Sequence, residues 1–135
     1  MATIKLEIVT PEAKAYSDDV DVVTLTGIDG EMGIYPQHMP LMTQLVAGEM
    51  QVRKGAENIF LAVGDGFLQV TGEKISILTD MAVRAENIDE SKSEEARQRA
   101  EARLAGKLSD EELASVSASL AHSLVQIKVK RRTTK

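Results

Sequence analysis

The sequence contains no cysteine and no tryptophan, and these absences exclude several classes of protein at once. Without cysteine there can be no disulfide bond, no zinc finger, no iron–sulfur cluster and no thiol nucleophile. With only two phenylalanines and two tyrosines, the chain also has few aromatic platforms on which single-stranded nucleic acid could stack. We therefore expect neither a disulfide framework nor a nucleic-acid partner.

Long apolar runs are missing as well. No segment approaches the roughly 20 apolar residues that a membrane-spanning helix needs. The first twenty residues carry charged side chains where a signal peptide would have its apolar core. These are Lys5, Glu7, Glu12 and Lys14. The expectation is a soluble chain in the cytoplasm, which is peripheral to a membrane only through a partner.

Residue types that carry chemistry are sparse and scattered. His38 and His122 are the only histidines, and neither stands in a cluster of metal-ligand residues, so we expect no metal site. The adjacent acids Asp18 and Asp19 are interpreted as solvated, because an acid–base pair needs one carboxylate in an apolar pocket. There is no GxxxxGK[ST] phosphate loop and no nucleophile elbow. The sequence favours a non-catalytic protein without a cofactor.

The net charge of −5 conceals an uneven distribution. Residues 1–83 hold five basic and twelve acidic side chains, and residues 84–112 hold six basic and nine acidic ones. No acid follows Glu112, whereas the last eight positions carry five cations. Such a basic end indicates an acidic partner, a tail that folds back onto the acidic body, or simply a solvated helix end.

Up to about residue 83 the apolar pattern has a period of two. Ile4, Leu6 and Ile8 alternate with charged residues, which predicts a strand with one face in a core and the other in water. Similar short segments follow, separated by turns that contain glycine or proline. They lie at residues 20–25, 50–52, 58–63, 66–70 and 74–79. Many short strands at this spacing predict an antiparallel sandwich or flattened barrel.

In the last third of the chain the period becomes helical. The first helix is rich in Ala, Glu and Arg, has Asp89 or Ser91 as its N-cap, and ends at Gly106. A second helix begins at Ser109, which forms a capping box with Glu112. Its expected apolar stripe is Leu113, Val116, Leu120, Leu124 and Ile127. The two helices predict an antiparallel hairpin that packs weakly on the strands, because the first helix offers mainly alanine.

Together these patterns predict an α+β protein of two parts. Residues 1–86 form an N-terminal antiparallel β-sandwich, and residues 87–135 form a C-terminal antiparallel two-helix hairpin. Because its packing is weak, this hairpin could detach from the sandwich.

One stretch, GEMGIYPQHMPL at residues 30–41, is specific enough to indicate a family. It resembles the Gly-Glu/Asp-x-Gly-Ile/Val-Leu-Pro-x-His-x-Pro-Leu loop of the epsilon subunit of F-type ATP synthases, with Tyr35 where leucine is usual. Three other segments resemble the same family, so the likeness spans the whole chain. They are TIKLEIVTPE (3–12), LAVGDGFLQV (61–70, with Asp65 where the family often has glycine) and KISILTDMAVRAENID (74–89).

The resemblance implies about ten strands and a role in the rotor. A subunit of this family sits in the central stalk, binds the gamma subunit and rests on the ring of membrane c subunits. The family's loop contacts the c ring, so the implied contact residues are Glu31, Tyr35 and His38, although Glu31 could also be a solvated turn acid. The complex would lie at the cytoplasmic face of a bacterial plasma membrane.

The resemblance also implies a role for the basic end. In the family the hairpin either folds against the sandwich or extends along gamma into the alpha/beta catalytic head. In the extended form its basic residues meet an acidic loop of the beta subunit and inhibit ATP hydrolysis. The residues that fit this role by charge and position are Lys128, Lys130, Arg131 and Arg132.

Some family members bind ATP on the folded hairpin through an Ile/Leu-Asp-x-x-Arg-Ala motif. This chain has Lys92 in place of the arginine and Ser93 in place of the alanine. In the second helix His122 and Gln126 stand where arginines would fall. Because lysine cannot reproduce the planar guanidinium fork, we expect no nucleotide site, with Asp89 serving as a helix cap.

Two other classes of function stay open at this level. The first is a stand-alone β-sandwich binding module whose helical tail recognises a small ligand or an acidic protein. The second is a small acid–base enzyme, which would need a carboxylate of raised pKa in a pocket, and the sequence offers no candidate.

Overall fold

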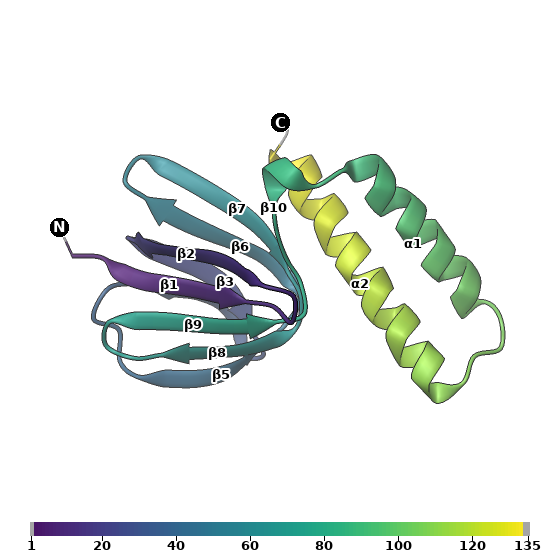
Figure 1. The fold of residues 1–135 in the computed structure, drawn as a ribbon, viewed down its shortest axis with the longest axis horizontal. Helices are drawn as coiled ribbons and strands as arrows, with labels where there is room; N and C mark the ends of the chain where they lie inside the picture. Colours follow the sequence, from purple (N-terminus) through teal and green to yellow (C-terminus); the bar gives the residue numbers. More distant parts are fainter. Residues whose placement is uncertain (1, 134–135) are drawn as a thin grey trace.

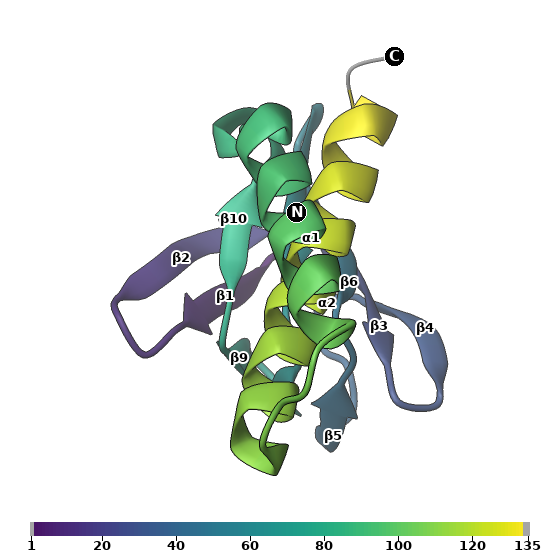
Figure 2. The ribbon, with the colours of Figure 1, turned by 90° about the vertical axis from the view of Figure 1, so that its right-hand side faces the viewer.

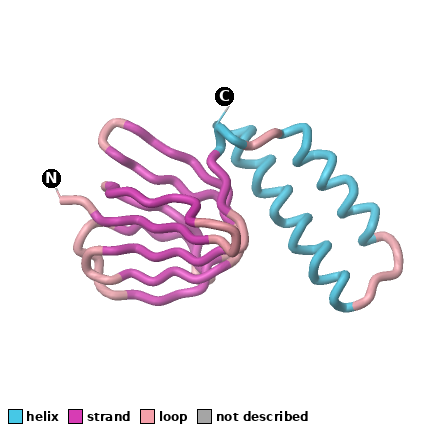
Figure 3. Tube along the Cα trace, viewed as in Figure 1, coloured by secondary structure: helices cyan, strands magenta, loops and turns pink. Residues whose placement is uncertain are grey.

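The computed structural model describes residues 2–133 and consists of a β-sandwich followed by two helices (Figure 1 and Figure 3). Within these residues the strands are β1 (Ile4–Val9), β2 (Lys14–Val20), β3 (Val22–Gly27), β4 (Gly30–Ile34), β5 (Leu41–Leu45), β6 (Gly48–Lys54), β7 (Glu57–Val63), β8 (Gly66–Val70), β9 (Lys74–Thr79) and β10 (Ala82–Arg84). A 3-10 turn η1 (Ala85–Asn87) leads to the helices α1 (Glu90–Leu104) and α2 (Asp110–Thr133). The α+β architecture expected from the sequence is confirmed.

The strands form two layers around the main core. Their hydrogen bonds follow one path, β10-β7-β6-β3-β5-β8-β9-β1-β2, with β4 beside β3. β3 and β5 are paired only through Gly27 and Leu45, and the path folds over at this point. β1 and β9 run parallel, whereas the other strand pairs in residues 2–133 are antiparallel. The parallel pair joins strands far apart in the sequence, so local periodicity could not reveal it.

Alternation along each strand decides which side chains enter the core. Ile4, Leu6 and Ile8 of β1 are buried as predicted, each at most 1% exposed. The register left open around residues 20–25 is settled by β3, where Val23 and Leu25 point inward and Val22 is half-buried. The layer that faces β3 consists of β5, β8, β9, β1 and β2. Besides the β1 residues it contributes among others Leu45, Leu68, Val70, Ile75 and Ile77 to the core.

The hairpin packs on the sandwich through α2, which lies between the strands and α1 (Figure 1). Seen from the side, α1 covers the face of α2 that points away from the sandwich (Figure 2). The contact contains a small second apolar cluster, which is separate from the main core. Its buried members are Ala62, Met81, Ala85, Ile88 and Val129, with Phe60, Val83 and Val125 at its margin. The proposed division between residues 86 and 87 falls within η1.

The apolar stripe expected along α2 is only partly correct. Val116 and Ile127 are buried, but Leu113 and Leu124 are each 47% exposed. Val129, which was not part of the expected stripe, is fully buried in the second cluster. The reason is that α2 packs against α1 on one side and against β7 on another, so its buried positions do not follow a single line.

Side-chain caps determine where the helices begin. The Lys92 N–H donates to Asp89 Oδ1 at 3.1 Å, so Asp89 is the N-cap of α1. At α2 the Glu112 N–H donates to Ser109 Oγ at 3.2 Å, and the Ser109 N–H donates to the Glu112 carboxylate at 3.4 Å. This is the predicted capping box. The hydrogen bonds from Ser109 lower the pKa of the Glu112 carboxyl, so the cap persists until the pH falls below the usual carboxylate range.

Among residues 2–133, neither α-helix combines the length and the apolarity that crossing a membrane requires.

Candidate interaction surfaces

The loop between β4 and β5, residues 35–40, is held in a defined shape. The His38 N–H donates to the Tyr35 carbonyl at 3.2 Å and closes a β-turn with proline at its second position. Gln37 follows with a φ of 66°, the left-handed conformation required at the third position of a type II turn. His38 Nδ1 lies 2.6 Å from the Met39 carbonyl, and because a carbonyl only accepts, Nδ1 carries the proton. Two hydrogen bonds thus hold the turn in one conformation.

This loop presents an amphipathic surface. Tyr35 is 61% exposed and Met39 is 79% exposed, while His38 is half-buried beside them. A groove of about 750 Å³ runs between the loop and the β8–β9 turn around Gly72 and Glu73. Tyrosine and methionine are enriched in protein interfaces. The loop therefore has the exposed residue types of a contact site, on a turn held by hydrogen bonds.

Glu31 does not belong to this loop, although the motif suggested one continuous contact segment. It is the second residue of β4, is exposed, and pairs with Thr26 of β3. With a rise of about 3.3 Å per residue, it lies about 13 Å from Tyr35, at the opposite end of the strand. The structure thus brings Tyr35 and His38 together and separates Glu31 from them. Two glycines in β4 obscured the alternation that would have identified a strand.

An exposed apolar surface lies on the outer face of β5, β8 and β9. Met42, Phe67 and Leu78 are 70%, 60% and 59% exposed, and the strand register places Phe67 opposite Leu78. We call these three residues the sheet surface. Sequence reasoning missed it, although segments 66–70 and 74–79 carry apolar residues on both faces, which was an available signal. Clustered exposed apolar side chains of this kind mark a binding surface.

The basic end of α2 is folded back onto the sandwich, which is one of the alternatives that its charge left open. Arg132 Nη1 lies 2.6 Å from Glu49 Oε1 of β6, a carboxylate whose side chain is only 13% exposed. Lys130 Nζ donates to the Ala85 carbonyl of η1 at 3.2 Å. Lys128 is exposed on the solvent side of α2. Lys135, the last cation of the sequence, lies outside the described residues.

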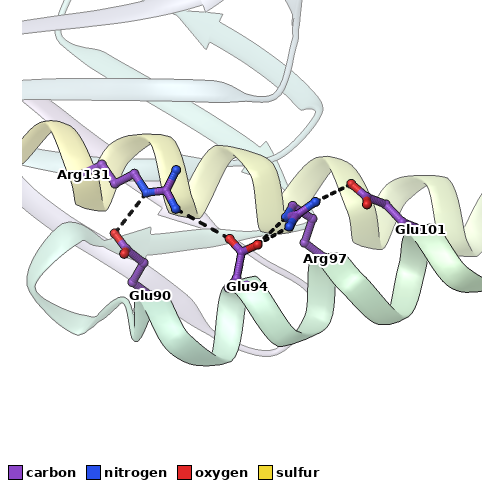
Figure 4. Close-up of polar contacts among 5 residues, drawn as sticks. All are labelled: Glu90, Glu94, Arg97, Glu101 and Arg131. Atoms are coloured by element: carbon purple, nitrogen blue, oxygen red, sulfur yellow. Dashed lines mark hydrogen bonds and ion pairs between the residues drawn. The ribbon is translucent and has the colours of Figure 1, made fainter.

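Arg131 joins a network of ion pairs between the two helices (Figure 4). Its guanidinium lies 3.5 Å from Glu90 and 3.7 Å from Glu94, both on α1. Arg97 contacts the same Glu94 and also Glu101, at 2.6 Å. Hydrogen bonding from Arg97 lowers the pKa of the Glu94 carboxyl, so this charge is retained when the pH falls into the range where ordinary carboxylates protonate. The network links α2 to α1.

Of the four cations predicted to contact a partner, Lys130, Arg131 and Arg132 thus bind acceptors of the chain itself in this folded form. The same side chains can meet an external acidic surface only after these contacts break.

The residues of the degenerate nucleotide motif take part in helix contacts. Asp89 is the N-cap, and Ser93, which is buried, donates from Oγ to Gln126 Oε1 at 2.9 Å. Lys92 is exposed. Within residues 2–133, no group of three or more His, Asp or Glu side chains is arranged to hold a metal ion.

We expect ATP titrated into the isolated chain to give no measurable binding heat. Ser93 and Gln126 bond to each other, and Lys92 lacks the guanidinium fork. The control is the triple variant Lys92→Arg, Ser93→Ala, Gln126→Arg, which supplies the residue types of the ATP-binding motif and the second-helix arginine. Micromolar affinity of the unmodified chain for ATP in isothermal titration calorimetry would show the expectation to be wrong.

The fold and these surfaces define a class of protein: a β-sandwich with a hydrogen-bonded loop between β4 and β5, an exposed apolar sheet surface, and a two-helix hairpin whose basic end is folded back onto the sandwich. The sequence profile of the ATP synthase delta/epsilon chain β-sandwich domain matches residues 3–85, and that of the delta/epsilon chain long α-helix domain matches residues 86–131. The chain therefore belongs to the family of ATP synthase delta/epsilon chains, as the motifs indicated. It is a non-catalytic subunit rather than an enzyme.

Relatives of known identity match over nearly their full length. The ATP synthase epsilon chain of Dehalococcoides mccartyi is 46% identical over 100% of this chain and 97% of its own. That of Desulforamulus reducens is 40% identical over 93% of this chain and 96% of its own.

Solved structures show the same fold. A chain in the cryo-EM structure of the Euglena gracilis mitochondrial ATP synthase, OSCP/F1/c-ring in rotational state 1, matches with a TM-score of 0.73 at 23% identity, covering 99% of this chain and 82% of that chain. A chain of the Tetrahymena thermophila mitochondrial ATP synthase central stalk/c-ring structure matches with a TM-score of 0.62 at 11% identity, covering 98% and 96%.

Proposed function

We propose that the chain is a rotor subunit in the central stalk of a bacterial F-type ATP synthase, where it couples the catalytic head to the c ring during ATP synthesis driven by an ion gradient. The observation that carries this proposal is family membership over both parts of the chain. The similar Euglena and Tetrahymena chains come from assemblies described as containing F1, the central stalk or the c ring. The subunit would be peripheral, at the cytoplasmic face of the plasma membrane.

The loop of residues 35–40 is the proposed contact with the c ring. Tyr35 and His38 would touch the ring directly, and the hydrogen-bonded turn beneath them supports this role because a stiff contact transmits torque without internal deformation. Glu31, at the other end of β4, would make a separate polar contact with the c ring.

The sheet surface is the proposed contact with the gamma subunit. Phe67 and Leu78 are exposed opposite each other on β8 and β9, and Met42 of β5 is exposed opposite Gln69, two residues along β8 from Phe67. A partner would remove their apolar area from water. A subunit that turns with a shaft needs a permanent grip, and permanent interfaces are the more apolar ones.

The hairpin is the proposed inhibitor of ATP hydrolysis. When extended, its basic end would bind an acidic surface of the alpha/beta head through Lys128, Lys130, Arg131 and Arg132. The exposure of Lys128 and the small second cluster beneath α2 support a hairpin that can be released.

The test is co-purification. Phe67→Glu places a charge in the sheet surface, so we expect it to reduce recovery of gamma and the alpha/beta head with the tagged subunit by at least about tenfold, because burying an unpaired charge is costly. Arg53→Glu introduces the same carboxylate at an exposed position of the other layer and should leave recovery unchanged. If the unmodified chain recovers no gamma in mild buffer, the central-stalk proposal fails. If Phe67→Glu recovers gamma normally, the interface lies elsewhere.

A further inference from the structure

Met81 lies where the sandwich meets the hairpin. Its backbone belongs to the sandwich, in the turn between β9 and β10. The Met81 carbonyl accepts hydrogen bonds from the Gly64 N–H at 2.9 Å and from Thr79 Oγ1 at 3.2 Å, and the Met81 N–H donates to Thr79 Oγ1 at 3.4 Å. None of these bonds involves α1 or α2, so Met81 keeps its place in the sandwich when the hairpin detaches.

The side chain of Met81, by contrast, is covered by α2 (Figure 1). The residue is only 8% exposed and belongs to the second apolar cluster together with Val129 of α2. Gln126 Nε2 donates to the thioether sulfur, with 3.1 Å between nitrogen and sulfur. At the preceding position of the turn, Asp80 Oδ1 lies 3.1 Å from His122 Nε2. Because α2 lies over this turn, its departure would open the sulfur to solvent.

The other methionines among residues 2–133 have different surroundings. Met39 and Met42 are 79% and 70% exposed. Met50 is fully buried in the main core, and Met32 is half-buried against the same core. In this part of the chain, Met81 is therefore the methionine whose exposure depends on the hairpin.

We propose that Met81 is an oxidation site controlled by the position of the hairpin, with a hydroperoxide such as hydrogen peroxide as the oxidant. The sulfur lone pair attacks one peroxide oxygen, the S–O bond forms as the O–O bond breaks, and the leaving hydroxide takes the remaining proton to form water. The thioether is oxidised to the sulfoxide and the peroxide is reduced. The docked α2 shields the sulfur from this attack, and the detached hairpin exposes it.

The sulfoxide does not fit the docked form. The 3.1 Å between Gln126 Nε2 and the Met81 sulfur leaves no room for an oxygen atom between them. The other members of the second cluster are apolar, and burying a polar oxygen among them without a hydrogen-bond partner is costly. Extra volume in a packed site is destabilising as well. Oxidation of Met81 therefore favours the detached hairpin.

The regulatory meaning of this oxidation rests on the proposed inhibition of ATP hydrolysis. An oxidised Met81 would keep the hairpin off the sandwich and available to the catalytic head. The effect would be reversed by a methionine sulfoxide reductase, which restores the thioether.

The first test measures the rate of oxidation at each methionine in the full chain, with hydrogen peroxide as the reagent and tandem mass spectrometry as the readout. We expect Met81 to react at least about fivefold more slowly than Met39 but faster than Met50, because hairpin release costs less than opening of the main core. Val129→Glu, which places a carboxylate in the second cluster, should raise the rate at Met81 about fivefold or more and leave Met50 protected. Ala118→Glu, at an exposed position of α2, should change neither rate.

Gln126→Ala is a second variant for the case in which circular dichroism shows Val129→Glu to be unfolded. It removes the side chain that bonds to the sulfur and introduces no charge, so the rate at Met81 should rise about twofold or more. The inference is overturned if Met81 reacts as fast as Met39 in the unmodified chain. It is equally overturned if the rate at Met81 stays the same in every folded variant.

A matched pair of substitutions tests the consequence of oxidation. Met81→Gln places polar atoms where the sulfoxide would lie, whereas Met81→Leu keeps an apolar side chain of similar volume. Because the chain has no native cysteine, cysteines introduced at the exposed residues Ala56 and Ala102 carry a pair of dyes, and energy transfer reports hairpin position. The urea concentration is the one that leaves the hairpin of the unmodified chain half docked.

We expect Met81→Gln to lower the docked-to-detached ratio about fivefold or more, and Met81→Leu to leave it within about twofold of the unmodified chain. Equal ratios in the two variants would show that a polar group at this position does not release the hairpin. Both tests use the isolated chain, so a negative result here is separate from a failure of inhibition, which is measured as ATPase rate.

Discussion

Replacing Lys128, Lys130, Arg131 and Arg132 together by glutamine should raise the rate of ATP hydrolysis by the assembled enzyme about threefold or more at low salt. Each exposed ion pair contributes only about 0–1 kcal/mol, so the four must act together to hold an extended hairpin on an acidic surface. The change also removes the contacts of Arg132 with Glu49 and of Arg131 with α1, which favours release. A released hairpin without cations has nothing with which to bind the head, so the rate still rises.

A matched variant separates the two states of the hairpin. Glu49→Gln keeps the size of the side chain but removes the charge that Arg132 meets in the folded form, while all four cations remain. It should therefore lower the hydrolysis rate, the opposite of the quadruple variant. Both effects should shrink as salt is added, because the Debye length falls from about 10 Å at 0.1 M. An unchanged rate of the quadruple variant at low salt would show that the basic end is not the inhibitory contact.

Gly66→Ala should destabilise the sandwich by more than about 3 kcal/mol, measured as the free energy of unfolding in urea. An added Cβ would lie 1.9 Å from the Leu78 carbonyl oxygen and 2.9 Å from the Leu78 carbonyl carbon. These atoms are backbone of the adjacent strand, so relief requires β8 and β9 to separate. Gly66 is the glycine before phenylalanine in the segment that resembles the family, and this close approach gives that motif a physical cause.

The control for this prediction is Gly72→Ala, in the turn between β8 and β9. No heavy atom lies within 4 Å of a Cβ built at this position, and its backbone is not left-handed. The variant should be unchanged or slightly more stable, by less than about 1 kcal/mol, because alanine restricts the unfolded chain. If both variants have the same stability, the close approach at Gly66 is not what requires glycine.

The candidate contact residues show how far the motif could be followed. The GEMGIYPQHMPL stretch identified the family. It did not show that Glu31 belongs to a strand, because Gly30 and Gly33 interrupt the apolar alternation. The sheet surface was missed for the opposite reason: Phe67 and Leu78 are apolar at positions where a solvent-facing residue is expected to be polar.

By itself the sequence determined whatever depends on neighbours along the chain. Alternation placed Ile4, Leu6 and Ile8 of β1 in the core, and short-range capping residues set the start of α2 at Ser109. For α1 they narrowed the N-cap to Asp89 or Ser91, and the structure has Asp89. These features involve residues within about four positions of one another, so periodicity and residue type suffice.

The tertiary structure alone decided which distant groups meet. The parallel pairing of β1 with β9, the bridge of Arg132 to Glu49 across 83 positions, and the Asp80–His122 pair all depend on how the sandwich closes and where α2 docks. No local pattern encodes these contacts, because many folds bury the same apolar stripes while bringing different charged side chains together. That choice is made by packing of the whole chain, and it is packing that folds the basic end back onto its own acids.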